Sequence, residues 1–398
     1  MLSPHRLSAS PAPAQEAPRE WPPATSGRST AYVPLTDLNA SHQPLRAELV
    51  CAFERVLDSG RFVSGEEVGA FEAALAEYVE TAHAVAVGSG TAALTLALMG
   101  AGVGPGDEVI LPANTFFATA EAVVAAGARP VVADVDPASA SIDPHSVASL
   151  LTSRTAAIIA VHLYGHPADV HALRVLADAR SLLLLEDAAQ AMGASLDGRR
   201  VGALGDAAAF SFFPTKILGA LGEGGAVTTN DPQLADRVRL LRSHGEPVKN
   251  LHQMMGFNER MDEVQAALLM VKLAHLEEDL DQRAMIVSRY HELLREVPEL
   301  DLFTTAPTAR SVPHLMAVKV PDRNRVLGEL QAKGVGAGVH YPTPIHLQPA
   351  WRQLGTAAGK LPHAEALAQS VLSLPLYSQM SFAQVERCIG ALAEAMGS

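Results

Sequence analysis

Short apolar runs alternate with amphipathic segments through the middle of the chain, and this pattern predicts strands that alternate with helices. The strands are expected at His83–Val87, Glu108–Leu111, Pro130–Asp134, Ala157–His162, Leu182–Glu186, Ala207–Phe212 and Ala226–Thr229. The first five runs are almost continuously apolar, which is typical of strands buried on both faces of a largely parallel sheet. The helices are expected at Thr91–Met99, Thr115–Ala126, Ala168–Asp178 and Pro232–Arg242. The alternation indicates an α/β domain in which helices cover a sheet.

Beyond about residue 260 the pattern changes to longer helices and shorter apolar segments. The elements expected there are Met261–Asp279, Gln282–Glu296, Leu315–Val320, Arg323–Lys333, Val335–His340 and Ser381–Met396. We therefore expect a large domain over residues 34–280 and a smaller C-terminal α+β domain over residues 281–398. Residues 1–33 are rich in Pro, Ser and Ala and lack the apolar centre of a signal peptide, so they are expected to form a disordered tail.

Charge and composition narrow the range of partners. The formal net charge is −13, which makes nucleic acid and anionic membrane poor partners. No apolar run has the length of a membrane span. The two cysteines, Cys51 and Cys388, form neither a CxxC pair nor a metal-ligand spacing, so no metal site is expected. These features together predict a cytoplasmic protein.

Lys216 is the first lysine of the chain, and it lies within the apolar run Ala207–Gly219. Burial lowers the pKa of a lysine because it disfavours the charged form. A neutral amine can attack a carbonyl carbon and form a Schiff base, so the position is suited to nucleophilic chemistry. This segment alone leaves a second interpretation open, in which the lysine ends a strand and its charged head reaches solvent.

Two strand ends carry polar groups that are suited to binding a ligand. Glu186 and Asp187 close the strand that begins at Leu182, and ligands of α/β sheets bind at that edge. A carboxylate there can keep a heteroaromatic nitrogen protonated, although acids at strand ends also cap helices. The turn Gly88–Thr91 passes from a strand into a helix, whose N-terminus favours anions. An ordinary turn capped by Ser89 or Thr91 explains the same residues.

Four further positions are candidates for ligand contact. Phe116 follows a strand and could stack on a flat cofactor or simply pack in the core. Ser211 could donate a hydrogen bond to a phosphate. The segment Gly256–Arg260 precedes a long helix and either reaches a neighbouring molecule or forms a solvated loop. His340 and His346 lack the spacing of a metal site, so polar contact with a ligand is the favoured interpretation.

Five blocks contain most of these residues: SGTAAL at Ser89–Leu94, GDEVILPANTFFATA at Gly106–Ala120, EDAAQAMGA at Glu186–Ala194, FSFFPTKILGALGEGGAVTTND at Phe210–Asp231 and GFNERMDEVQAALL at Gly256–Leu269. In this order they resemble the DegT/StrS-type nucleotide-sugar aminotransferases of the pyridoxal-phosphate fold-type-I superfamily. The resemblance covers roughly residues 34–398. It implies a mixed, mostly parallel seven-stranded sheet in the large domain and a pyridoxal 5'-phosphate cofactor, with pyridoxamine 5'-phosphate as its amino form.

The resemblance also implies a role for each matching residue. Lys216 would bind the cofactor aldehyde, and Asp187 would pair with the pyridine nitrogen. The other implied contacts are Gln190 with the ring hydroxyl, Phe116 with the ring face, and Gly90, Thr91 and Ser211 with the phosphate. Asn258 and Arg260 would reach the site of the opposite subunit, which implies a homodimer with shared active sites. His340 and Tyr341 match a stretch near the sugar pocket.

The implied reaction moves an amino group from an amino acid, by analogy glutamate, to a nucleotide-linked keto-6-deoxyhexose. The acceptor carbon would be C3 or C4, and the block that begins at Pro112 resembles the C3 enzymes of antibiotic sugar pathways somewhat more. Arg242, Lys249 and Arg260 are candidate cations for the diphosphate. The alternatives are a cyclitol aminotransferase, a sugar dehydratase and a non-enzymatic sensor. Lys216 argues against the dehydratase branch, which has histidine there. A nucleotide-binding oxidoreductase would need a GxGxxG motif that Gly88–Ala93 lacks.

Overall fold

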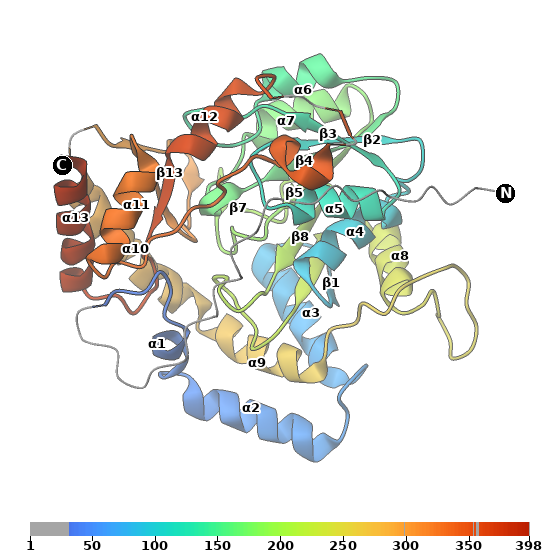
Figure 1. Ribbon diagram of the computed structural model, residues 1–398. Helices are drawn as coiled ribbons and strands as arrows, with labels where there is room; N and C mark the ends of the chain where they lie inside the picture. Colours follow the sequence, from blue (N-terminus) through green and yellow to red (C-terminus); the bar gives the residue numbers. More distant parts are fainter. Residues whose placement is uncertain (1–31, 298, 353, 356–357, 398) are drawn as a thin grey trace, which may run out of the picture. The chain divides into compact units, whose positions relative to one another are not determined.

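The computed structural model describes residues 32–297, 299–352, 354–355 and 358–397. Its centre is a seven-stranded sheet in the order β1-β9-β8-β5-β4-β2-β3 (Figure 1). The strands are β1 His83–Val87, β2 Glu108–Pro112, β3 Arg129–Ala133, β4 Thr155–Val161, β5 Leu183–Asp187, β8 Ala207–Ser211 and β9 Gly225–Thr229. All seven predicted strands are therefore confirmed, most of them to within one or two residues.

The sheet is mixed because one inner strand runs against its neighbours. β9 is antiparallel to both β1 and β8. The pairs β5–β8, β4–β5, β2–β4 and β2–β3 are parallel. The carboxyl ends of β2, β4, β5 and β8 consequently meet at one edge, where ligands of open α/β sheets bind. This arrangement confirms the expected mostly parallel sheet of fold type I.

Helices cover both faces of the sheet, each over its own apolar core. On one face lie α4 Gly90–Gly100, α5 Ala118–Ala125 and α8 Pro232–Arg242. On the other face lie α3 Glu66–Val79, α6 Pro144–Leu150, α7 Val170–Asp178 and α9 Glu263–Ala274. Successive residues of the strands alternate between the two cores, as the two-residue period of a strand requires. The predicted helix Thr115–Ala126 begins three residues late, because residues 115–117 form the loop that leaves β2.

The C-terminal region forms a second, smaller layer with a separate core. The antiparallel strands β10 Asp301–Leu302, β12 Met316–Lys319 and β13 Val371–Leu374 pack with α10 Leu276–Leu294, α11 Arg323–Ala332 and α13 Phe382–Gly397. The remaining elements are α1 Leu38–His42, α2 Arg46–Ser59, α12 Pro362–Ser370, the short strands β6 Ser195–Leu196, β7 Arg199–Arg200 and β11 Ala309–Arg310, and the 3-10 helices Leu163–Gly165, Ile345–Leu347 and Pro349–Trp351. A smaller α+β unit was expected, and the structure confirms it.

Two expectations about element boundaries are wrong. The break between the long helices lies at His275, so the predicted boundary after Asp279 falls inside α10. Residues 276–294 contain no glycine or proline, and nothing in them interrupts a helix. The predicted element Val335–His340 forms only isolated bridges, from Val335 to Val33 and from Gly338 to Ser373.

The N-terminal expectation lies almost wholly outside the described residues. Its last residue, Val33, is buried against the C-terminal core and pairs with Val335. The predicted limits of the two domains stay predictions. Among the residues that the structure describes, no helix has the length and apolar character needed to cross a membrane.

Candidate active site

A cavity of about 590 Å³ opens at the carboxyl edge of the sheet. Nine of the residues singled out in the sequence line it: Gly90, Thr91, Phe116, Asp187, Gln190, Ser211, Lys216, His340 and Tyr341. They come from the ends of β1, β2, β5 and β8 and from the C-terminal segment after β12. The fold thus gathers at one point residues that are up to 251 positions apart in the chain.

One wall of the cavity is the N-terminus of α4. The Ser89 hydroxyl accepts a hydrogen bond from the Ala92 amide at 3.1 Å and caps the helix. A Cβ atom at Gly90 would lie 2.6 Å from the Cβ of Ser211, so only glycine allows this close approach between α4 and β8. The first amides of a helix have no intrahelical partner, and the helix dipole favours an anion beside them. Gly90, Thr91 and Ser211 therefore form a cradle that fits a phosphate.

Lys216 lies on a tight loop that follows β8. The Lys216 amide donates to the Phe213 carbonyl at 2.8 Å, and the Ala220 amide donates to the Phe212 carbonyl at 2.7 Å. Burial lowers the pKa of the Lys216 amine to about 8, although the charge of Asp187 opposes the shift. A useful fraction of the amine is therefore neutral near pH 7, as a nucleophile requires.

Helix α9 supports this loop from outside the cavity. The Lys272 amine donates to the carbonyl of Gly219, and the Gln265 side chain accepts from the Leu221 amide at 2.9 Å. The Glu263 carboxylate, at the start of α9, accepts from the amides of Gly65 and Glu67 at the start of α3. One helix thus ties the lysine loop to the helical layer behind the sheet.

Asp187 is the last residue of β5, and its side chain faces the cavity. Its Oδ2 atom accepts from the Thr119 hydroxyl at 2.8 Å, and its Oδ1 atom accepts from the Ala189 amide at 3.2 Å. Burial raises the pKa of Asp187, whereas these two hydrogen bonds and the nearby Lys216 lower it. The carboxylate keeps acceptor capacity on the side of the cavity, where a protonated ring nitrogen could bind.

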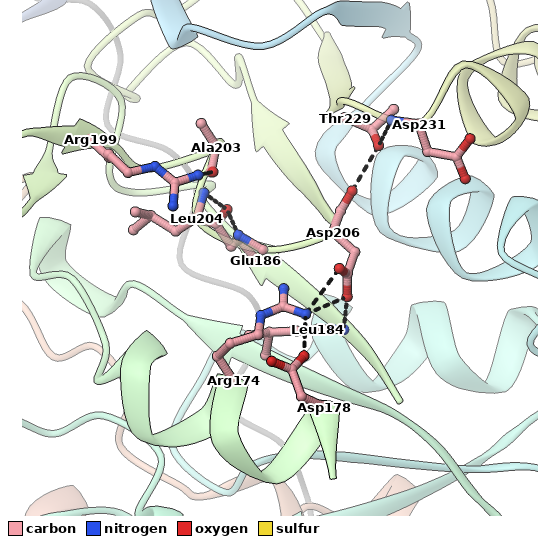
Figure 2. A network of polar contacts seen from close by, with 11 residues as sticks. Arg174, Asp178, Leu184, Glu186, Arg199, Ala203, Leu204, Asp206, Thr229 and Asp231 are labelled. Carbon is pink, nitrogen blue, oxygen red and sulfur yellow. Dashed lines mark hydrogen bonds and ion pairs between the residues drawn. The ribbon is translucent and has the colours of Figure 1, made fainter. Parts of the chain in front are cut away.

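Glu186, one residue earlier, faces the opposite side of the sheet. Its carboxylate accepts from the amides of Gly202, Leu204 and Gly205 at 2.7–2.9 Å, and it lies 3.0 Å from His162 Nε2. Figure 2 shows the contact with Leu204 beside the network in which Asp206 accepts from the Leu184 amide and pairs with Arg174. Glu186 therefore holds the loop after β7 in place and does not reach the cavity.

The roof of the cavity is aromatic and neutral. Phe116 is 57% exposed, and its ring centroid lies 5.7 Å from that of Tyr341. The Gln190 side chain donates to the Tyr341 hydroxyl at 3.2 Å and accepts from the Tyr164 amide at 2.7 Å. Burial lowers the pKa of His340 to about 4 and raises that of Tyr341, so both groups are uncharged near neutral pH.

Sequence analysis missed several cavity residues. Thr115 and Thr119 lie inside the block that was quoted for Phe116, and their four-residue spacing at a helix start was the available signal. His314 also lines the cavity, and burial holds its pKa well below the usual range. No motif marked His314, because it follows an irregular segment of the smaller unit.

Asn258 and Arg260 do not line the cavity of their own chain. Asn258 is exposed. Arg260 is half-buried and bridges Val87 through its backbone, whereas its guanidinium has no hydrogen-bond or ion-pair partner among the described residues. The loop between α8 and α9 extends away from the sheet in Figure 1, and Asn258 lies at its base, where it bridges Ser243. Arg242 is unsuited to the diphosphate, because it pairs with Glu72 and donates to the Ala86 carbonyl.

The described residues contain no cluster of three or more His, Cys, Asp or Glu side chains that could hold a metal. The cavity instead offers an anion cradle, a lysine with a partly neutral amine, a buried carboxylate and an aromatic roof. Pyridoxal phosphate fits these groups, since it combines a phosphate, an aldehyde and a ring nitrogen on one flat ring. Fold and site together define a pyridoxal-phosphate-dependent transferase of fold type I.

Comparisons with known proteins agree with this class. Residues 44–393 match the model of the DegT/DnrJ/EryC1/StrS aminotransferase family, and the chain belongs to that family. It is 47% identical over 370 residues to dTDP-3-amino-3,4,6-trideoxy-alpha-D-glucose transaminase of Streptomyces venezuelae, covering 93% of this chain and 98% of the relative.

Solved structures give the same result. The crystal structure of DesV from S. venezuelae has a TM-score of 0.90 at 47% identity, covering 92% of this chain and 98% of DesV. NtdA of Bacillus subtilis with bound PMP has a TM-score of 0.86 at 31% identity, covering 94% of this chain and 87% of NtdA. The chain is accordingly an aminotransferase that uses pyridoxal phosphate, as the resemblance implied.

Proposed function

We propose that this enzyme transfers an amino group from glutamate to a nucleotide-linked keto-6-deoxyhexose, with C3 favoured over C4 as the acceptor carbon. The observation that carries this proposal is the cavity in which Lys216, Asp187 and the α4 cradle converge. The preference for C3 rests on the relative from S. venezuelae, which is a dTDP-3-amino-sugar transaminase. Glutamate as the donor rests on family analogy.

Each polar group has a defined task in this proposal. Bound pyridoxal phosphate supplies an electron sink that stabilises negative charge on the substrate carbon. The neutral Lys216 amine would bind the cofactor aldehyde and, once free, would carry a proton to and from the substrate carbon. Asp187 would hold the ring nitrogen protonated, which would keep the ring electron-poor. Gly90, Thr91 and Ser211 of the α4 cradle would hold the phosphate, and Gln190 would contact the ring hydroxyl.

The aromatic roof and its neighbours position the ring and the sugar. Phe116 presents its exposed ring to one face of the cofactor, and stacking there excludes water. Uncharged His340 and Tyr341 can exchange hydrogen bonds with sugar hydroxyl groups without the cost of burying a charge. Lys216 and Asp187 would thus work in a closed environment that strengthens their electrostatic interactions.

The charges of the cavity indicate that a second copy of the chain completes it. Lys216 is the single Lys or Arg side chain among the described residues that line the cavity. A dicarboxylic donor and a nucleotide diphosphate both carry negative charge and require additional cations. Arg260 lies outside its own cavity, and its guanidinium has no partner in the described part of the chain, so we propose that it and Asn258 enter the site of a partner in a homodimer.

Helix α2 offers a surface for this dimer. Its inner residues Leu49 and Ala52 pack on α9. Its outer residues Val50, Phe53 and Leu57 are 42%, 46% and 54% exposed. Val50, Phe53 and Leu57 are spaced to share one face of the helix, and a contiguous exposed apolar patch of this kind marks a contact surface for another protein molecule.

Product analysis tests the transfer itself. The enzyme is incubated with nitrogen-15 glutamate and a panel of dTDP- and UDP-linked 3-keto and 4-keto sugars, and the products are identified by mass spectrometry. We expect labelled amino-sugar and an equal amount of 2-oxoglutarate, with the 3-keto sugars turned over fastest. Keto-sugar consumption without 2-oxoglutarate would identify a dehydratase, a labelled aminocyclitol would identify a cyclitol enzyme, and no turnover would favour a sensor.

A mixing experiment tests the shared site. Lys216→Ala and Arg260→Ala homodimers are each expected to be inactive, but random exchange of subunits creates one intact site in half of the dimers. About a quarter of the wild-type activity should return. As a control, Lys216→Ala mixed with Asp187→Asn should stay inactive, because both residues belong to the same chain's cavity. Recovery in the control but not in the test mixture would contradict the proposal.

A further inference from the structure

Two threonine hydroxyls connect the loop after β2 to the carboxylate at the end of β5. Thr115 Oγ1 lies 2.8 Å from Thr119 Oγ1, and Thr119 Oγ1 lies 2.8 Å from Asp187 Oδ2. The side chains of Thr115 and Thr119 are 4% and 1% exposed. The three groups form a buried chain of hydrogen bonds along the wall of the cavity, which all three residues line.

The chemistry of the carboxylate determines the direction of both hydrogen bonds. An ionised carboxylate only accepts hydrogen bonds, and a hydroxyl has a single proton to donate. Thr119 therefore gives its proton to Asp187, and its oxygen must accept the proton of Thr115. Thr115 thus fixes the rotation of the Thr119 hydroxyl, and hydrogen bonds aligned in one direction strengthen one another.

Asp187 depends on this hydroxyl because the other groups that stabilise its charge are a longer amide hydrogen bond and the nearby Lys216 amine. The structure describes one further hydrogen bond to the carboxylate, from the Ala189 amide at the longer distance of 3.2 Å. His162 lies nearby, but its Nδ1 atom accepts from the Ala168 amide and its Nε2 atom faces Glu186, which indicates a neutral imidazole. Burial favours the protonated acid, and Thr119 is the strongest opposing contact.

We propose that Thr119, oriented by Thr115, is a positioning residue that keeps Asp187 ionised and directs its remaining lone pairs into the cavity. This inference rests on the proposed role of Asp187 as the partner of a protonated ring nitrogen. It extends that role to two residues that do not need to touch the cofactor nitrogen. Without the Thr119 hydroxyl, the pKa of Asp187 would rise further, and a protonated carboxyl group could no longer stabilise the proton on the ring nitrogen.

The test compares Thr119→Val, Thr119→Ser and Thr115→Val. Valine keeps the shape of threonine and removes the hydroxyl, whereas serine restores the donor. Thr228→Val is the matched control, because the Thr228 hydroxyl is equally buried but donates to the Gly202 carbonyl. The readouts are the carboxyl absorption of Asp187 in cofactor-free protein, by infrared difference against Asp187→Asn, and the pH dependence of kcat in the holoenzyme.

We expect Thr119→Val to raise the pH midpoint of Asp187 protonation by about one unit, which corresponds to about a tenfold change in its protonation equilibrium. The acidic limb of the kcat profile should move in the same direction while KM changes little. Thr115→Val should give a smaller shift of the same sign, and Thr119→Ser should return the midpoint to that of the wild type. Thr228→Val should lower stability without moving either midpoint.

An unchanged carboxyl midpoint and kcat profile in Thr119→Val would overturn the inference. If that variant does not fold, an unchanged midpoint in Thr115→Val overturns it equally. A failure of the proposed function would be recognised by a different result, because a fully active Asp187→Asn enzyme would show that Asp187 itself has no role in catalysis. An inactive Asp187→Asn enzyme beside an unaffected Thr119→Val enzyme would refute only the positioning role.

Discussion

Glu186 and Asp187 are neighbours on β5 and both are buried, yet they differ in how their charge is balanced. Glu186 accepts three backbone amides and contacts His162, which uses almost all of its acceptor capacity. Asp187 accepts one hydroxyl and one longer amide contact, and it faces a cavity. A carboxylate saturated by the backbone supports the fold, whereas one with free lone pairs is available to a ligand. The comparison predicts that substitutions on the cavity side lower activity, whereas substitution of Glu186 lowers stability.

The largest effect is expected on the cavity side from Lys216→Ala. Turnover should fall by more than about 10⁴-fold, because both the bond to the cofactor and the proton transfer require the amine. The free energy of unfolding should stay within about 1 kcal/mol of the wild type, since the Lys216 amine makes no ion pair with any residue that the structure describes. Steady-state assays, visible absorption spectra and urea denaturation measure these quantities. Wild-type turnover would disprove the central assignment.

The next effect is expected from Asp187→Asn. An amide cannot hold the ring nitrogen protonated, so kcat should fall on the order of 100- to 1000-fold, while the protein stays folded and keeps some cofactor. Cofactor content by absorbance and kcat per bound cofactor distinguish lost chemistry from lost binding. Full activity of the Asp187→Asn enzyme would show that Asp187, like Glu186, is not needed for catalysis.

Glu186→Gln should produce the opposite result. Its amide nitrogen would face backbone N–H groups that need acceptors, so the free energy of unfolding should fall by about 2–4 kcal/mol. The kcat of the molecules that remain folded should be unchanged, because Glu186 does not reach the cavity. Urea titration and assays at low temperature measure the two quantities. A folded, stable variant with lost activity would show that Glu186 takes part in catalysis.

The smallest effect is expected on the pKa of Lys216, which the charge of Asp187 raises. Burial lowers the pKa of the Lys216 amine to about 8. As the pH rises toward that value, the rate at which the cofactor-free enzyme binds the cofactor should increase about tenfold per pH unit, and above that value the rate should level off. Removing the charge in Asp187→Asn takes away the interaction that raises this pKa, so the midpoint should move down. Stopped-flow absorbance gives the midpoint, and Glu186→Gln, which leaves that interaction in place, serves as the control.

Much of the fold could be predicted because the strand signal is local. Continuous apolar runs located all seven strands of the main sheet, and the Gly-rich turn and strand-end acids located the cavity edge. The boundary between α9 and α10 could not be predicted, since no glycine or proline marks His275. The α2 helix was not predicted, and three apolar residues on its exposed side, Val50, Phe53 and Leu57, blur its amphipathic pattern.

The site was only partly predictable, for a different reason. Sequence showed two acids at one strand end but could not assign them to faces, because both faces of a buried strand are apolar. The hydrogen bond from Thr119 to Asp187 joins residues 68 positions apart, and no local pattern carries that information. The place of Asn258 and Arg260 in a dimeric site stays a prediction, as does the cytoplasmic location.

Helix α9 makes two sets of contacts on different sides. Through Lys272 and Gln265 it supports the loop of Lys216, and through Ala267 and Leu268 it packs against α2. In the dimer proposed above, substitutions that move α9 to change the contact through α2 would also displace the loop of Lys216. The residues of α9 would then be constrained by the position of the reactive amine as well as by the contact between subunits.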